Sequence, residues 1–282
     1  MRPRIAVTGI GARCSVASNA QELSEALRTG RRGLVPLEDP RLSTLRATHA
    51  GLIGEIAPFE DDRDRVRGLD RNVHLALAAM RESLDNAGID EPLGPHGAVV
   101  FGTCSGGMLT IESHYEALVA GRDPVDEDLL FSKRYYTTAK VLAWAAGASG
   151  PVLSVVTACA AGAGAIAQAA DLIRTGMARR VVAGGSDVFA GSTLVGFDAL
   201  KATTEGLCAP FSNPIGLNLG EGAAFLVLER FEDAAARGAK ILAEVLGSGL
   251  SNDAYHPTAP DPSARGQLAA MGAALSDAGI TP

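Results

Sequence analysis

The sequence has few cysteines, few aromatic residues and no excess of positive charge. Its 282 residues include four cysteines, only 5% are aromatic, and the formal net charge is −7. The cysteines form no CxxC pair, and no histidine cluster has metal-ligand spacing, so we expect neither a disulfide framework nor a metal site. Such cysteine usage suits a reducing cytoplasm. The negative net charge provides no general field for phosphate, so non-specific nucleic-acid binding is not expected.

Long apolar runs are also missing. No run reaches the roughly 18 residues that a membrane-spanning helix needs. The N-terminus MRPRIAVTGIGARCS starts with basic residues, but its apolar stretch is short and broken by glycine. That pattern is typical of a first strand and turn rather than of a signal peptide, so no membrane span is expected.

Small apolar residues are abundant instead. Hydrophobic residues make up 47% of the chain, and 33 residues are glycine. Apolar periodicity predicts strands that alternate with helices, which indicates an α/β layered fold. The expected strands are 4–10, 97–103, 151–158, 179–187, 223–229 and 239–250, and the expected helices are 21–29, 69–87, 108–120, 133–147, 160–176, 231–238 and 263–279.

The last strand and helix have the pattern of a new α/β unit that has only begun. We therefore predict a first unit over residues 1–238 and the first elements of a second over 239–282. A sheet that gains one strand and then ends leaves an edge exposed. We expect the isolated chain to need a partner or a further segment to cover it.

Cys159 stands where a β-branched strand meets a helix, in SVVTACAAGAGAIAQAADLIRTG. N–H groups at a helix N-terminus lack partners, and the dipole there favours the thiolate, which is the nucleophilic form. Ala160, Ala161 and Gly162 leave room for a substrate. On residues alone, Cys159 is either a nucleophile or a small core residue.

A cysteine nucleophile normally needs a base. His256 lies in a loop of turn-forming residues, SNDAYHPTAPDP, directly after a predicted strand. The other four histidines lie in helical patterns or in loops without a supporting motif. The residues alone therefore suggest a Cys159–His256 dyad.

Several segments in order resemble one enzyme family across the whole chain. TACAAGAGAIAQAADLIRTGMARRVVAGGSD resembles the active-site segment of β-ketoacyl-acyl-carrier-protein synthases, condensing enzymes of the thiolase superfamily. GLNLGEGAAFLVLERFEDAAARGAKILAEVLGSGLSNDAYHPTAPDP resembles the next signature block, RIAVTGIGARCS the N-terminus and GTCSGGM the acyl-pocket turn. The resemblance implies a thiolase-like fold of αβαβα layers, with the first half complete, the second half begun, and homodimeric or heterodimeric pairing.

The resemblance also implies a reaction. Cys159 aligns with the acyl-accepting nucleophile, which takes an acyl group from the phosphopantetheine of acyl carrier protein. Decarboxylation of malonyl-carrier protein then gives a carbanion that attacks the thioester, as in fatty-acid or polyketide synthesis. No cofactor bound to the chain itself is expected.

Further site residues follow from the resemblance alone. His256 and Thr258 align beside the malonyl-side pocket, which replaces the catalytic dyad suggested above. Ser105 and Phe197 align with the acyl tunnel, although each also suits a simple turn or core role. DDRDRVRGLDR is similar to the carrier-protein docking segment through Arg63, Arg65 and Arg67, yet its interleaved aspartates equally suit a solvated charge run.

In the family, two catalytic histidines, a lysine and a glycine-rich oxyanion loop follow the segment that aligns with residue 282. We therefore expect these residues alone not to condense substrates, and a separate C-terminal half is one expected partner. Two alternatives are a non-catalytic ketosynthase-like partner and an acyl-binding scaffold. A thiolase-type acyl-CoA transferase fits the DAYHPTAP block less well.

Overall fold

The chain folds around one six-stranded sheet. The computed structural model describes residues 2–56, 68–124, 130, 134–211, 213, 215–256 and 258–282. The strand order is β5-β4-β6-β7-β1-β8. The strands are β1 (Ile5–Cys14), β4 (Gly97–Gly102), β5 (Val152–Val155), β6 (Arg180–Asp187), β7 (Gly222–Arg230) and β8 (Ala243–Glu244), and β2 (Val35–Pro36) pairs separately with β3 (His49–Ala50).

Strand direction gives the sheet two chemically different ends. β4 pairs in parallel with β5 and β6, whereas β7 lies antiparallel to both β6 and β1. The C-terminal ends of β1, β4, β5 and β6 therefore meet the start of β7 at one end of the sheet. The antiparallel register pairs Arg180 with Glu229 near the opposite end.

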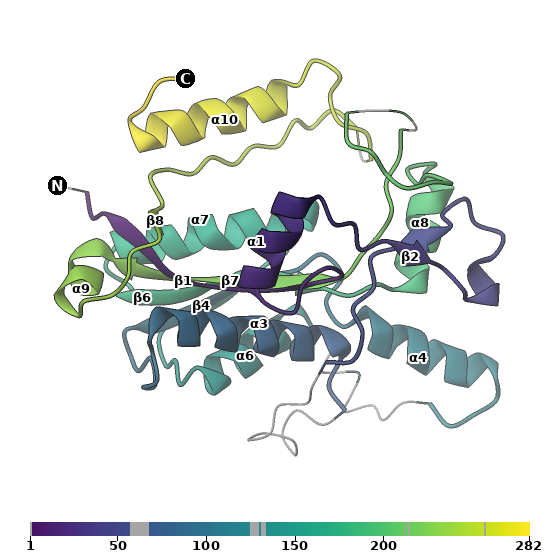
Figure 1. Ribbon diagram of the computed structural model, residues 1–282, viewed down its shortest axis with the longest axis horizontal. Coiled ribbons are helices and arrows are strands. Elements are labelled where there is room, and N and C mark those ends of the chain that lie inside the picture. The colour runs from purple at the N-terminus through teal and green to yellow at the C-terminus, as the bar shows by residue number, and fades with distance from the viewer. Residues whose placement is uncertain are drawn as a thin grey trace.

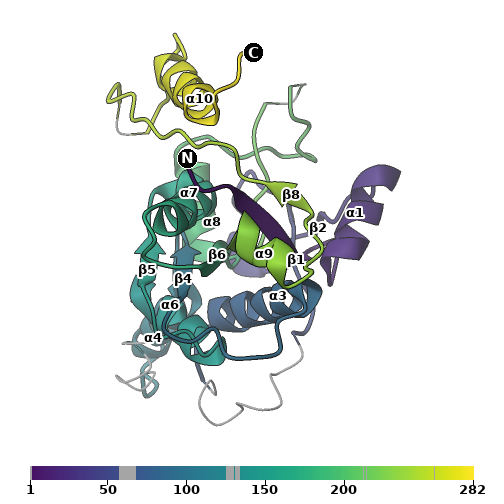
Figure 2. The same cartoon turned by 90° about the vertical axis from the view of Figure 1, so that its left-hand side faces the viewer.

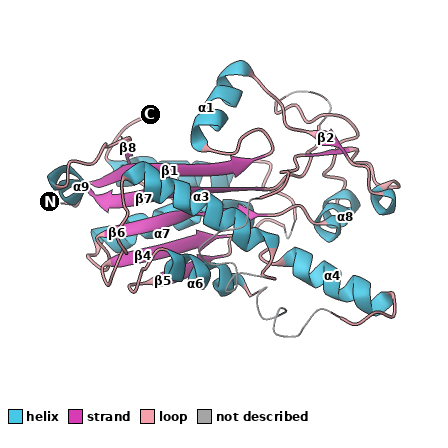
Figure 3. Ribbon diagram, turned by 60° about the horizontal axis from the view of Figure 1, so that its bottom comes forward, coloured by secondary structure: helices cyan, strands magenta, loops and turns pink. Residues whose placement is uncertain are grey.

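Helices cover both faces of the sheet, as Figure 3 shows. α3 (Arg71–Ala87) and α6 (Tyr135–Ala145) pack on one face, and α7 (Ala161–Arg174) packs on the other. The alternation of β4 serves both layers, because Val99 and Phe101 join the α3–α6 core while Ala98 and Val100 join the α7 core.

Helix α3 approaches the sheet closely. Its N-cap is Asp70, whose carboxylate accepts the Asn72 N–H at 2.9 Å, and it ends at Gly88 with φ 64°. A Cβ placed on Gly11 of β1 would lie 1.9 Å from the Ala79 carbonyl oxygen. Glycine at that position allows β1 and α3 to pack backbone against backbone.

The remaining helices lie around this core. They are α1 (Ala20–Thr29), η1 (Pro40–Leu42), α4 (Met108–Val119), η3 (Ala158–Ala160), α8 (Gly191–Ala199), α9 (Phe231–Ala236) and α10 (Arg265–Ala278). Figures 1 and 2 show α10 beyond α7, on the side away from the sheet. Arg174 of α7 contacts Asp277 of α10 at 3.3 Å. No described helix is long and apolar enough to span a membrane.

Several elements differ from the sequence prediction, among them β2, η1 and β3, which were not expected. The strand expected over 239–250 is reduced to Ala243–Glu244, since only these residues pair with β1. The following segment packs on α10, where a Cβ on Gly249 would lie 2.1 Å from the Ala270 carbonyl oxygen. Helix α8 was not expected, because GSTLVGFDA has no amphipathic period.

Candidate active site around Cys159

Cys159 lies on the short turn between β5 and α7. The turn contains the 3-10 helix η3, and α7 begins two residues after Cys159. Ala158 has φ 50°, a left-handed conformation that costs a non-glycine residue about 1–2 kcal/mol. This conformation turns the chain sharply, and the Cys159 side chain is exposed rather than packed in the core. The core alternative for Cys159 does not fit that exposure.

The thiol faces a cavity of about 540 Å³ at the end of the sheet where four strands finish. Helix α1, the turn and α7 also contribute residues. The lining residues are Ala12, Arg13, Cys14, Leu23, Gly102, Cys104, Ala158, Cys159, Ala161, Gly162, Ile166, Gly184, Gly185, Ser186, Asp187, Gly222, Ala223 and Ala224. No histidine is among these described residues.

Glycines allow the backbone segments around the cavity to pack directly against one another. A Cβ on Gly102 would lie 2.4 Å from the Ala161 carbonyl oxygen, and one on Gly185 would lie 2.4 Å from the Gly102 carbonyl oxygen. The end of β4 therefore touches the first turn of α7 directly. This contact fixes the height of the Cys159 turn above the sheet.

Asp187, at the end of β6, organises the turn that faces Cys159. Its carboxylate accepts the Thr103 hydroxyl at 2.8 Å, the Cys104 N–H at 2.9 Å and the Ser105 N–H at 2.7 Å. The sequence analysis missed Asp187 as a site residue. The available signal was a carboxylate at the end of a strand, RVVAGGSD, whose middle residues are apolar or glycine.

Cys104 and Cys14 share the cavity with Cys159. Burial raises the pKa of the Cys104 thiol, and the negative charges of Asp187 and Cys159 raise it further. Cys104 therefore remains a protonated thiol near neutral pH. Among the described residues, no group of three or more His, Cys, Asp or Glu side chains is arranged to hold a metal ion.

The predicted acyl-tunnel residues lie near the cavity end of the sheet without lining the cavity itself. Ser105 is part of the turn that Asp187 holds, and Phe197 is half-buried in α8. Neither is among the residues of the Cys159 cavity. Their acyl-tunnel roles remain predictions.

His256 and Thr258 form a local turn in an exposed loop. His256 Nδ1 accepts the N–H of Thr258 at 3.1 Å and the N–H of Ala259 at 3.2 Å. His256 is not among the residues that line the Cys159 cavity. The structure therefore does not join Cys159 and His256 into a dyad, and the malonyl-side role of His256 and Thr258 remains a prediction.

The predicted docking residues Arg63, Arg65 and Arg67 lie outside the described residues. Arg71, at the end of the same basic segment, is described. Its guanidinium lies 2.9 Å from Glu221, whose side chain is only 5% exposed. Arg71 thus stabilises a nearly buried carboxylate.

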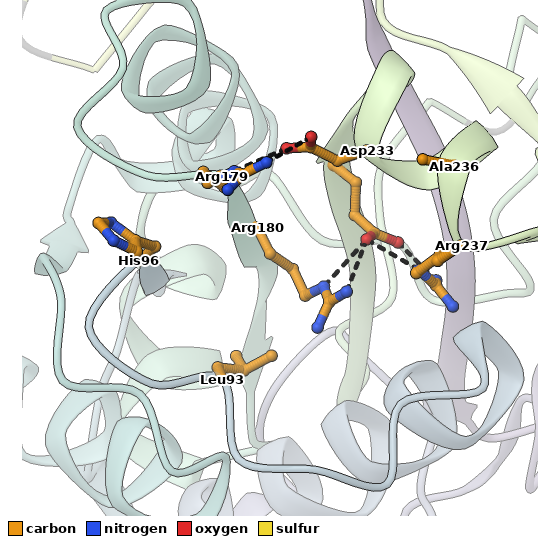
Figure 4. A pocket seen from close by; sticks show the side chains of 8 residues that line it. Leu93, His96, Arg179, Arg180, Asp233, Ala236 and Arg237 are labelled. Carbon is orange, nitrogen blue, oxygen red and sulfur yellow. Dashed lines mark hydrogen bonds and ion pairs between the residues drawn. The ribbon is translucent and has the colours of Figure 1, made fainter.

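A second cavity, of about 490 Å³, lies at the opposite end of the sheet. Figure 4 shows Arg179 next to Asp233, and Arg180 and Arg237 nearby. Arg180 and Arg237 both bind Glu229, at 2.9 and 2.6 Å, and the Thr8 hydroxyl donates to the same carboxylate at 2.6 Å. These ion pairs connect β6, β7 and α9.

Glu229 is ionised although it is buried. Burial alone would raise its pKa, but hydrogen bonds from Arg237 and Thr8 and the charges of Arg180 and Arg237 outweigh that effect. The pKa of Glu229 therefore lies below its ordinary value. Both oxygens of this carboxylate already have partners within the protein. The cluster therefore has a structural role and joins neighbouring elements at this end of the sheet.

Comparison with known proteins decides the family. The sequence matches the model of the beta-ketoacyl synthase N-terminal domain over residues 2–234 and that of the C-terminal domain over 242–282. The chain belongs to the beta-ketoacyl synthase family. The predicted boundary at residue 238 remains a prediction.

Relatives in this family match nearly the full chain. Nodulation protein E from Rhizobium sp. (strain N33) is 36% identical over 99% of this chain and 70% of its own length. A 3-oxoacyl-(acyl-carrier-protein) synthase 2 from Vibrio cholerae is 34% identical, with 99% and 70% covered. The similarity to these relatives supports a ketosynthase-type condensing enzyme of the acyltransferase class.

A solved structure agrees with the predicted fold. The ishigamide ketosynthase/chain length factor superposes with a TM-score of 0.91 at 32% identity, over 100% of this chain and 71% of that one. The prediction of a thiolase-like α/β ketosynthase fold is confirmed. The six-stranded sheet and its helix layers are the part of that fold described here.

Proposed function

We propose that Cys159 accepts an acyl group from the phosphopantetheine thioester of acyl carrier protein. When a partner supplies the two histidines and the oxyanion loop expected of the family, the acyl-enzyme then undergoes decarboxylative condensation with malonyl-carrier protein in fatty-acid or polyketide-like synthesis. The observation that carries the proposal is an exposed cysteine, on a left-handed turn at the start of α7, facing a cavity in a beta-ketoacyl synthase chain.

The geometry suits acyl transfer. The Cys159 thiolate adds to the thioester carbonyl, and the pantetheine thiolate then leaves with the bonding electron pair. N–H groups in the first turn of α7 have no carbonyl four residues earlier within the helix, so they can donate to the developing oxyanion. The glycines and alanines of the cavity leave space for the acyl group.

Other residues complete the proposal. The pantetheine arm and acyl chain would pass the turn that carries Ser105, with Phe197 along the acyl tunnel. His256 and Thr258 would serve the malonyl side, and Arg63, Arg65 and Arg67 would contact the acidic carrier protein. The chain itself binds no cofactor in this proposal.

The exposed edge of the sheet supports pairing with a second ketosynthase chain. β5 is an end strand, and Val152, Leu153 and Val156 on or beside it are 36–44% exposed. An unpaired strand edge with exposed apolar side chains favours strand addition. The ishigamide ketosynthase/chain length factor couples a ketosynthase with a second component, which supports pairing with a different chain.

Acyl loading tests the proposal. We expect incubation with an acyl-carrier-protein thioester, or with cerulenin, to give one adduct by intact-mass measurement, and peptide mapping to place it on Cys159. C159A should abolish the adduct, since no other thiol stands on the α7 turn. C208S is the matched control and should load normally, because Cys208 lies outside the cavity.

Absence of an adduct from the folded, reduced wild-type chain, or an adduct that persists in C159A, would contradict the proposal. The first outcome supports an acyl-binding scaffold or a non-catalytic partner. Transfer from acyl-CoA but not from the carrier protein supports a thiolase-type transferase instead.

A further inference from the structure

Three of the four cysteines of this chain line one cavity. Cys14 ends β1, Cys104 follows β4 by two residues, and Cys159 follows β5 by four. Cys104 and Cys159 are both exposed. The proposed function uses only Cys159.

The backbone brings Cys104 and Cys159 together. Gly102 pairs with Val155 in the parallel ladder, and the Thr103 N–H donates to the Val155 carbonyl at 3.2 Å. Gly102 also touches the Ala161 carbonyl, as the 2.4 Å approach of its added Cβ shows. Cys104 lies two residues beyond Gly102, and Cys159 two residues before Ala161. Cys104 and Cys159 therefore each lie two residues from the contact between Gly102 and Ala161, and both line the same cavity.

Electrostatics agrees with this proximity. The electrostatic interaction with Cys159 is one of the causes that raise the pKa of Cys104. The Cys104 N–H, bound to Asp187 at 2.9 Å, anchors the turn in this orientation.

Cys14 lies too far away to take part. β1 is separated from β4 by β6 and β7, so three strand spacings, about 14 Å, divide them across the sheet. A disulfide requires Cα atoms about 4.4–6.8 Å apart. Cys14 thus lines the same cavity but lies too far from the other two cysteines to form a disulfide with either.

We propose that Cys104 is a resolving thiol that forms a reversible disulfide with Cys159 under oxidation by a peroxide. The inference rests on the proposed function of Cys159 as the reactive thiol. In the first step, the Cys159 thiolate attacks one peroxide oxygen of hydrogen peroxide, and hydroxide leaves and takes up a proton. This step gives Cys159 sulfenic acid and one water. In the second, Cys104 sulfur attacks the Cys159 sulfur and loses its proton, and the hydroxyl leaves as a second water.

The disulfide has two consequences for the site. It removes the thiolate that would take the acyl group, so acyl loading stops until a reductant restores both thiols. It also traps the sulfenic acid before further peroxide converts it to the irreversible sulfinic acid. Oxidative inactivation thereby becomes reversible.

Non-reducing peptide mapping tests this inference. The full chain is treated with hydrogen peroxide, blocked with iodoacetamide and digested with trypsin. Residues 82–122 hold only Cys104, residues 141–174 only Cys159 and residues 14–28 only Cys14. We expect 82–122 linked to 141–174, with the link lost after dithiothreitol. C14S should keep the link, whereas C104S and C104A should lose it and accumulate Cys159 sulfinic acid.

A folded wild-type chain with no link, in which Cys159 reaches sulfinic acid as fast as in C104S, would overturn the inference. A link from Cys14 to Cys159 would overturn it as well. Acyl loading of the reduced chain is measured in parallel. A chain that forms the link but does not load when reduced retains the disulfide and loses the proposed function, so the two failures are distinguishable.

Discussion

At the scale of single residues, Asp187 determines the shape of the wall opposite Cys159. Three donors from Thr103, Cys104 and Ser105 converge on its carboxylate. Hydrogen bonds to a charged acceptor contribute about 1.5–3 kcal/mol each to stability. The turn therefore keeps its position because one acceptor serves all three donors.

We expect D187N to lower the free energy of unfolding by about 1–3 kcal/mol, because the amide replaces a charged acceptor and brings N–H groups toward other N–H groups. Acyl loading of Cys159 should slow by on the order of ten- to a hundredfold, since a small displacement of the turn disturbs the bound thioester. Chemical denaturation measures the free energy of unfolding, and a quenched time course of acyl loading measures the rate. D233N, at the opposite end of the sheet, should leave the loading rate unchanged; an equal loss in both variants would show a general effect of destabilisation.

The residues predicted Cys159 as a candidate and the resemblance placed the GTCSGGM turn at the acyl pocket, but neither predicted that Cys104 and Asp187 line one cavity with Cys159. Cys104 and Asp187 stand 55 residues before it and 28 residues after it. Only the order of β4, β5 and β6 in the sheet places them opposite one another, and strand order is a property of tertiary packing. The dyad with His256 was suggested by a loop pattern alone, and the structure binds that imidazole to its own turn.

At the scale of elements, the contact between β4 and α7 sets the position of Cys159. Gly102 of β4 lies directly against the backbone of Ala161, with no space for a methyl group. The helix that follows Cys159 therefore rests on the strand through backbone atoms. A change in this contact must move the start of α7.

We expect G102A to lower the free energy of unfolding by about 1–3 kcal/mol through overpacking, and to reduce acyl loading because α7 is pushed away from the sheet. Thermal unfolding and the loading assay measure both. G196A in α8 is the matched control, since its added methyl meets nothing within 4 Å. That variant should be neutral or up to about 1 kcal/mol more stable. A G102A chain as stable as G196A would contradict the contact described here.

Most elements followed from periodicity, but those without a period did not. The apolar runs of β4, β6 and β7 and the amphipathic pattern of α3 predicted their positions to within a few residues. AKILAEVLGSGL contains strand-favouring Ile241 and Val245. A strand also needs a partner, and β1 pairs with only Ala243 and Glu244. The local sequence determines the strand propensity of a segment, whereas its pairing depends on which strand lies next to it in the fold.

At the scale of the whole molecule, the two cavities lie at opposite ends of the sheet and differ in the residues that line them. The cavity end carries thiols, glycines and Asp187, and the other end carries the ion pairs of Glu229 and Asp233. The Arg179 hydrogen bond is the main reason that the pKa of Asp233 lies below its ordinary value. Both carboxyls therefore bind protons less readily when the chain is folded.

Acid should destabilise the fold through this cluster. A carboxyl whose pKa is lower in the folded chain than in the unfolded chain stabilises the fold above its ordinary pKa. That stabilisation is lost as the pH falls through the lower, folded value. We expect the melting temperature to fall as the pH drops from 7 to below about 4.

E229Q tests the main contribution. It should cost about 3–5 kcal/mol at neutral pH, toward the lower end because Arg180 and Arg237 keep some contact with water. The acid slope of the melting curve should become shallower than in wild type, without vanishing, because Asp233 still titrates. Melting temperatures across the pH series measure it, and an unchanged slope would show that Glu229 does not contribute.

The eight-residue length of β6 has a consequence for how this chain can change over generations. It separates the Arg180 end from the Asp187 end by about 25 Å. Substitutions that far apart usually contribute independently to stability. The stability cost of a substitution around Cys159 therefore adds to the contribution of the charged end of the sheet and does not depend on it.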